Sequence, residues 1–316
     1  MSAYRAPWWL PGGHLQTILP ALLPAPRVRY TRERWETPDR DFVDVDCAGD
    51  PRARRLLVLF HGLEGGSTSR YARALAAQAA AAGWGFALPH FRGCSGVLNR
   101  LPRAYHSGDS DELDWMLRRF AERRVELHAV GVSLGGNALL KWLGERGAEA
   151  ARFVRRAAAV AAPLDLAASG RALDRGLNRR VYVPVFLATL KAKAFAKIAL
   201  GQLALDRRRL ARVRTLHEFD DLVTAPLHGF RDADEYWRRA SCGPWLGSIR
   251  VPTLVLNARN DPFLPARALE QAAPGASDRV VLDFQASGGH AAFPGLPLLQ
   301  HHSWMPRRVL EFLSAS

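Results

Sequence analysis

Residues 127–136 read Leu-His-Ala-Val-Gly-Val-Ser-Leu-Gly-Gly, and they constrain the fold of this chain more than any other stretch. An apolar, β-branched segment ends in Gly-x-Ser-x-Gly and gives way to a helix-forming run, which predicts a strand that turns sharply into a helix at Ser133. Gly131 and Gly135 lack the Cβ atoms that would clash in so tight a turn. The N–H of Leu134, unpaired at the helix N-terminus, could point at a developing negative charge. Ser133 is therefore the candidate nucleophile, and the alternative is a surface turn that merely contains serine.

The rest of the chain alternates strand and helix patterns. Continuous apolar runs predict strands that are buried on both faces, and helical patterns lie between these runs. Alternation of apolar and polar residues over 31–49 suggests a hairpin. The expected strands lie near 56–60, 84–89, 126–132, 153–162, 251–257 and 279–284, and the expected helices near 70–82, 107–124 and 305–313. Strands that alternate with helices predict an α/β fold with a mostly parallel, doubly wound sheet.

One long interruption breaks this alternation. Residues 165–245 look helical and basic and contain no strong strand candidate. We expect them to form a helical cap inserted into an α/β core built from 1–164 and 246–316. Within that core, the aromatic and proline-rich residues 1–30 are expected to pack across the other elements.

A serine nucleophile needs a base that is itself oriented by an acid, each placed just after a core strand. Asp261 follows the expected strand 251–257 in a turn that proline stiffens, and it is the preferred acid over Asp165, which follows an earlier strand. His290 follows the last expected strand, and two preceding glycines let its loop bend inward. His301 and His302 come too close to the final helix to be preferred.

The backbone should stabilise the oxyanion that forms when a serine attacks a carbonyl. The loop after the strand at 56–60 begins His61-Gly62-Leu63, and the N–H of Leu63 is the expected partner of the Leu134 N–H. Such donors act where negative charge develops in the transition state. An ordinary glycine-rich loop is the alternative interpretation.

The positive charge is concentrated in one segment. The chain carries a net charge of +14, and residues 171–214 hold twelve basic side chains against two acids. Compositional bias toward arginine and alanine would explain this, as would a basic face that meets anionic lipid headgroups or acidic substrates. Nucleic acid is a weaker alternative, because no recognised binding motif accompanies the charge.

Composition also indicates the cellular setting. Three cysteines without C-x-x-C spacing argue against a disulfide framework or a structural zinc site. No run of eighteen apolar residues and no secretory signal is evident, so a cytoplasmic protein is expected.

Several of these strings together resemble the AB hydrolase superfamily, and within it the AB hydrolase 4 family with its YheT-like bacterial members. They spread over nearly the whole chain: Gly12-Gly13-His14-Leu15-Gln16-Thr17, His61-Gly62-Leu63-Glu64-Gly65, Phe91-Arg92-Gly93-Cys94-Ser95-Gly96, Gly131-Val132-Ser133-Leu134-Gly135-Gly136, Glu218-Phe219-Asp220-Asp221 with Thr224-Ala225-Pro226, Asn260-Asp261-Pro262-Phe263, and Gly288-Gly289-His290.

The resemblance implies an α/β-hydrolase fold and a serine carboxylesterase with the triad Ser133, Asp261 and His290, without a metal or organic cofactor. Members of this family act on short acyl esters, monoacylglycerols or phospholipids, and some transfer the acyl group to an alcohol. Acyl transfer and a non-catalytic lipid-binding fold are therefore kept as alternatives to hydrolysis. A His-x₄-Asp spacing from His106 to Asp111 also occurs in glycerolipid acyltransferases, but here loop packing and helix capping are the preferred interpretation.

Overall fold

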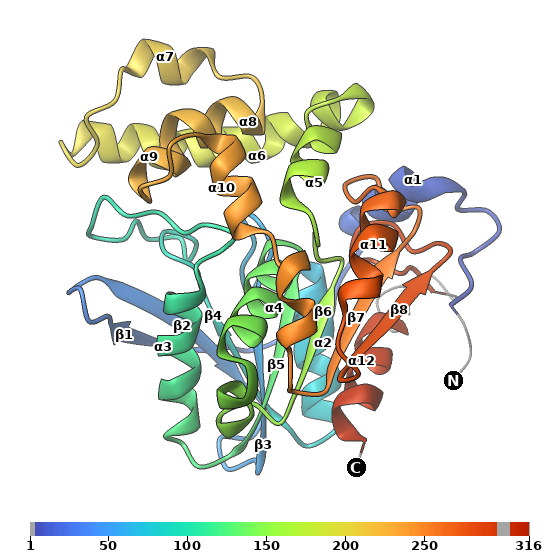
Figure 1. Cartoon of the computed structure of the whole chain (residues 1–316). Helices are drawn as coiled ribbons and strands as arrows, with labels where there is room; N and C mark the ends of the chain where they lie inside the picture. The colour runs from blue at the N-terminus through green and yellow to red at the C-terminus, as the bar shows by residue number, and fades with distance from the viewer. Residues whose placement is uncertain (1–3, 296–303, 316) are drawn as a thin grey trace.

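A computed structural model describes residues 4–295 and 304–315 (Figure 1). Eight strands form one sheet in the order β1-β2-β4-β3-β5-β6-β7-β8, in which β1 and β2 form an antiparallel hairpin and β3 to β8 run parallel. The strands are β1 (Thr31–Glu36), β2 (Phe42–Ala48), β3 (Arg55–Phe60), β4 (Gly85–Pro89), β5 (Glu126–Val132), β6 (Arg156–Val160), β7 (Thr253–Ala258) and β8 (Val280–Gln285). The predicted α/β fold, its hairpin and its parallel sheet are confirmed.

Two hydrophobic layers cover the two faces of the sheet. Along β3, Leu57 and Leu59 point into one layer and Val58 and Phe60 into the other, as the period of two in a strand requires. Helices α2 (Arg70–Ala81) and α12 (Trp304–Ser314) pack on the first face, and α3 (Ser110–Ala121) and α4 (Leu134–Arg146) on the second. The parallel strands β3 to β7 are buried on both sides, which explains their unbroken apolar runs, whereas β8 lies at the edge of the sheet and is partly exposed.

The segment between β6 and β7 is helical, as expected. Its helices gather above one end of the sheet in Figure 1: α5 (Leu166–Leu173), α6 (Gly176–Ala199), α7 (Arg207–Arg212), α8 (Leu216–Phe219), α9 (Ala225–Leu227) and α10 (Ala233–Ala240). A π-helical turn, Asp220–Thr224, joins α8 to α9. The division of the chain into a core and a cap domain stays a prediction.

The N-terminal segment contains a helix that the sequence pattern did not indicate. Helix α1 (Gly12–Leu22) starts with two glycines and contains Pro20, both unfavourable features in an isolated helix. It packs against the loops that follow β7 and β8, where Gln16 contacts Asn260 and Thr17 contacts His290. Upstream of α1, Tyr4 and Leu10 are buried, in agreement with the expected packing of this segment on the core.

No described helix is both long enough and apolar enough to cross a bilayer. The three cysteines are all free thiols, and Cys242 is buried.

The turn between β5 and α4 leaves no room for a side chain at Gly135. A Cβ atom there would lie 2.4 Å from the carbonyl oxygen of Phe60 and 2.5 Å from that of His61, so the helix start and β3 are in backbone contact. We predict that Gly135→Ala destabilises the protein by about 2 kcal/mol or more, because two backbone segments must separate. Chemical denaturation measures the change.

Gly275→Ala is the matched control, since a Cβ at that position meets no atom within 4 Å. Its effect should stay within about 0.5 kcal/mol. Equal unfolding free energies for the two variants would contradict the packing argument.

Candidate active site

Ser133 sits on a strained turn. Its backbone has φ +55° and ψ −120°, a conformation that residues with a side chain rarely adopt, and such strain clusters at functional sites. A Cβ on Gly131 would lie 2.4 Å from the backbone carbonyl oxygen of Gly135, so the turn closes only because residue 131 is glycine. The turn lifts the Ser133 hydroxyl out of the sheet edge into a cavity that Ser133 lines.

The structure brings together the three predicted triad residues. The Nε2 atom of His290 lies 3.0 Å from Oγ of Ser133, and its Nδ1 atom lies 2.8 Å from Oδ2 of Asp261. The second carboxylate oxygen of Asp261 accepts the N–H of Phe263 at 2.8 Å. The Phe263 ring packs on the imidazole with centroids 4.3 Å apart. The three side chains thus form one hydrogen-bonded line.

The alternative acid, Asp165, has a different role in the structure. Asp165 caps α5 by accepting the N–H of Ala168 at 2.9 Å, and no bond between Asp165 and His290 occurs among the described residues. His301 and His302 lie outside the described residues. The side chain of Asp111 is almost fully exposed and faces Arg146 rather than His106, so the His-x₄-Asp spacing does not bring an acid to a base.

The loop after β3 passes directly beside Ser133. A Cβ on Gly62 would lie 3.1 Å from the Cβ of Ser133. The next residue, Leu63, lines the same cavity as Leu134. No hydrogen bond from either leucine N–H to a described residue competes for these two predicted oxyanion donors.

His61 fixes the shape of this loop. Its Nε2 accepts the N–H of Phe91 at 3.0 Å, so the ring proton sits on Nδ1 and is donated to the carbonyl oxygen of Gly62 at 2.8 Å. Burial lowers the pKa of His61 to about 3, which keeps the ring neutral. The His-Gly pair is therefore a structural device here, and the imidazole takes no part in proton transfer.

Glu64, the residue that follows Leu63 in this loop, is held by Tyr105 and Lys193. The hydroxyl of Tyr105 accepts the Glu64 N–H at 2.8 Å and donates to Oε1 of that glutamate at 2.7 Å. Burial raises the pKa of Tyr105 well above its usual range, so the hydroxyl remains a donor. Lys193 on α6 donates to the same carboxylate oxygen at 2.8 Å. The helical insertion thus holds the loop that carries Leu63.

Helix α1 holds the loop that carries His290. The hydroxyl of Thr17 accepts the N–H of His290 at 2.9 Å and donates to the carbonyl oxygen of Gly13 at 2.7 Å. The side-chain oxygen of Gln16, which is 2% exposed, accepts the N–H of Gly288 at 2.8 Å and the amide of Asn260 at 2.9 Å. The same helix therefore ties together the loops of the acid and the base.

Glu64, Tyr105, Lys193, Gln16 and Thr17 were not assigned roles from the sequence. Gln16 and Thr17 belong to the string Gly-Gly-His-Leu-Gln-Thr, which was noted only as a point of resemblance. No periodicity connects α1 to a histidine more than 270 positions away, so the signal lay in that string alone.

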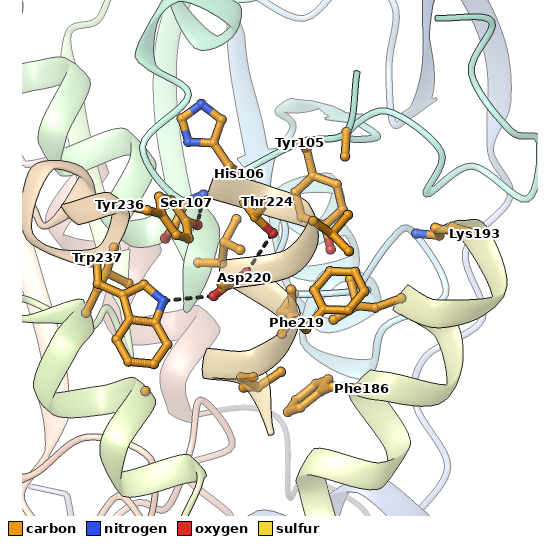
Figure 2. Close-up of a pocket in the computed structure, with 18 of the residues that line it drawn as sticks. Tyr105, His106, Ser107, Phe186, Lys193, Phe219, Asp220, Thr224, Tyr236 and Trp237 are labelled. Atoms are coloured by element: carbon orange, nitrogen blue, oxygen red, sulfur yellow. Dashed lines mark hydrogen bonds between the residues drawn. The ribbon is translucent and has the colours of Figure 1, made fainter. Parts of the chain in front are cut away.

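A cavity of about 160 Å³ opens at this site. Its floor carries Ser133, His290, Leu63 and Leu134, and its wall includes apolar side chains of the helical insertion such as Phe186, Leu190, Phe219 and Val223. Figure 2 shows Phe186, Phe219 and the aromatic rings of Tyr236 and Trp237 around the space. The cavity suits a molecule with an apolar part, since apolar contact there removes hydrocarbon from water.

Comparison with known proteins gives consistent results. A family model described as alpha/beta hydrolase fold matches residues 55–293. The chain is 38% identical over 310 residues to YheT of Escherichia coli, whose name describes it as an esterase, with 95% of this chain and 90% of that protein covered. It is 28% identical to the medium-chain fatty acid ethyl ester synthase/esterase 2 of Saccharomyces cerevisiae, over 92% of this chain and 66% of that protein.

Among solved structures, the Pf2001 esterase of Pyrococcus furiosus superposes with a TM-score of 0.58 at 15% identity, over 90% of this chain and 91% of that one. This likeness concerns the fold alone. The family model and the similarity to YheT point to the same fold. The chain therefore belongs to the alpha/beta hydrolase superfamily and, within it, to the YheT-like family.

Proposed function

We propose that this protein is a serine hydrolase of carboxylic esters. The observation that carries the proposal is the hydrogen-bonded line from Ser133 through His290 to Asp261, which opens into a largely apolar cavity. The name of YheT, at 38% identity, points to the same chemistry. Short-chain acyl esters and monoacylglycerol-like lipids are the substrates we propose, because an apolar wall faces the nucleophile.

The chemistry follows from the geometry. Nε2 of His290 takes the proton of the Ser133 hydroxyl while Oγ attacks the ester carbonyl carbon, and Asp261 holds the imidazole and stabilises its charged form. The N–H groups of Leu63 and Leu134 donate to the tetrahedral oxyanion. His290 then gives its proton to the departing alkoxide, which leaves an acyl group on Ser133. Water, activated by the same histidine, releases the acid.

Acyl transfer to an alcohol is the second candidate. It shares the acyl-enzyme and differs only in which hydroxyl compound attacks it. The yeast relative is named both a synthase and an esterase of ethyl esters, and the apolar cavity wall would disfavour water next to the acyl group. Product analysis with added ethanol or glycerol separates the two: hydrolysis yields free acid at all alcohol concentrations, whereas transfer yields the new ester.

We predict that Ser133→Ala lowers turnover of p-nitrophenyl butyrate by at least about a thousandfold and abolishes labelling by a fluorophosphonate, because the nucleophile is gone. Asp261→Asn should lower kcat by about 10³–10⁴-fold, since the histidine loses its orienting charge. Steady-state kinetics and a melting curve measure activity and folding. A folded Ser133→Ala variant that still turns the ester over would eliminate this residue as the nucleophile.

Asp165→Asn is the matched control for the acid. Asparagine can still cap α5, and the residue does not contact His290. Its kcat/KM should stay within about twofold of the wild type. A large loss there would shift the acid role to Asp165.

We also propose that Thr17 positions the catalytic histidine. Thr17→Val removes the hydroxyl that accepts the His290 N–H, with little change in shape. We predict a fall of about tenfold in kcat and in the rate of fluorophosphonate labelling, with KM nearly unchanged, because the base is misplaced while the cavity is intact.

Thr17→Ser keeps the hydroxyl and should restore the labelling rate. Labelling is measured on equal amounts of folded protein, so a loss of stability alone does not change it. A Thr17→Val variant that is labelled at the wild-type rate would show that this hydrogen bond does not position His290.

We further propose that the helical insertion meets anionic membranes. Between Val181 and Ala199, each exposed side chain of α6 is uncharged, and Val185 is 65% exposed. Helix α7, above α6 in Figure 1, exposes Arg207, Arg208, Arg209 and Arg212. An apolar stripe flanked by arginines suits an interface of acyl chains and anionic headgroups. A second copy of this chain fits less well, because two such basic segments repel.

We predict that the protein sediments with phosphatidylserine-containing vesicles, that binding falls as salt rises, and that Val185→Asp weakens it about tenfold or more. Val281→Asp, at a 46% exposed valine of β8, is the control and should bind as the wild type does. Equal binding to neutral and anionic vesicles would refute the electrostatic part of the proposal.

A further inference from the structure

One carboxylate faces the cavity and has no part in the triad. Asp220 begins the π-helical turn between α8 and α9, and it is the sole acidic residue among the described residues that line the cavity with Ser133 and His290. Figure 2 shows it between Thr224 and Trp237. π-helical turns are rare, and they occur frequently at functional sites.

The hydrogen bonds of Asp220 leave acceptor capacity unused. One carboxylate oxygen accepts the hydroxyl of Thr224 at 2.6 Å, and the other accepts the indole N–H of Trp237 at 2.8 Å. Each oxygen can accept a second hydrogen bond. No ion pair within the described part of the chain includes Asp220, and burial raises its pKa to about 6. At neutral pH it is thus a charged acceptor without a cation, which is costly unless a donor is supplied.

The basic side chains of the cavity wall are already occupied. Lys193 binds Glu64, Arg92 binds Glu112 at 2.7 Å, and Lys197 donates to the backbone carbonyl of Leu101. The negative charge of Asp220 would repel an anionic ligand, and the positive charges of the basic groups would repel a cationic ligand. A neutral hydrogen-bond donor is the ligand chemistry that satisfies Asp220 without either conflict.

We propose that Asp220 binds a hydroxyl group of the substrate, so that hydroxylated esters are preferred over plain alkyl esters. The inference rests on the proposed ester hydrolysis at Ser133. A carboxylate placed to receive a hydroxyl discriminates strongly, because an ester without that group leaves the buried charge unsatisfied.

The hydroxyl can come from either half of the ester. A glycerol monoester carries it on the alcohol, and a 3-hydroxyacyl ester carries it on the acyl chain. Two substrate pairs distinguish these sources: 1-butyrylglycerol against propyl butyrate, and ethyl 3-hydroxybutyrate against ethyl butyrate. We expect kcat/KM to favour the hydroxylated member of one pair by about tenfold or more.

Asp220→Asn is the test variant. The asparagine oxygen can accept the Trp237 N–H and its amide can donate to the Thr224 hydroxyl, so the internal contacts are retained while the charged acceptor is lost. In this variant, the kcat/KM ratio of the hydroxylated ester to its plain counterpart should fall about tenfold. Because both esters are measured on one preparation, the ratio is independent of how much protein is folded.

Asp221→Asn is the matched control, because it is the same substitution at the next residue of the same turn. Asp221 accepts the N–H of Ala233 and does not line the cavity. It should keep the wild-type preference. Equal turnover of all four esters, or an unchanged ratio in Asp220→Asn, overturns this inference alone. No turnover of any ester by the wild type overturns the proposed function and this inference with it.

Discussion

Backbone contact between α4 and β3 is the constraint on which the site depends. Gly135 lies against the carbonyl oxygens of Phe60 and His61, where even a methyl group would collide. This contact brings the helix N-terminus to the sheet edge and forces the positive φ of Ser133. It also sets the loop after β3 beside the hydroxyl. The positions of the predicted nucleophile and of both predicted oxyanion donors therefore depend on the same backbone contact, and the buried sheet around Ser133 sustains the strain there.

The predicted acid and base are held by a different part of the chain. Their loops follow the parallel strands β7 and β8, whose carboxyl ends meet at one edge of the sheet. Gln16 and Thr17 accept the backbone N–H groups of Gly288 and His290 in the loop after β8. Gln16 also accepts the side-chain amide of Asn260 in the loop after β7, and Phe263 packs on the imidazole. Helix α1, unfavourable by its own composition, is stable because those bonds satisfy groups that burial would otherwise leave unpaired.

The sequence allowed prediction of the sheet strands, the hairpin, the turn at Ser133 and the positions of Asp261 and His290. These features depend on local signals, since apolar runs, glycine spacing and strand ends are all visible within about ten residues. Helix α1 and the loop anchors Glu64 and Lys193 were not predicted, because each acts through partners 41 to more than 270 positions away. At these positions tertiary contacts override local helix propensity, and a pattern of neighbouring residues in the sequence does not reveal such contacts.

The two faces of helix α6 in the helical insertion have different surroundings. On the inner face of α6, Phe186 and Leu190 line the cavity, and Lys193 reaches the loop that carries Leu63. On the outer face, the exposed side chains from Val181 to Ala199 are small or apolar and uncharged. A movement of α6 toward an apolar surface would therefore act on the Lys193–Glu64 pair, because this pair connects the helix to the loop that carries Leu63.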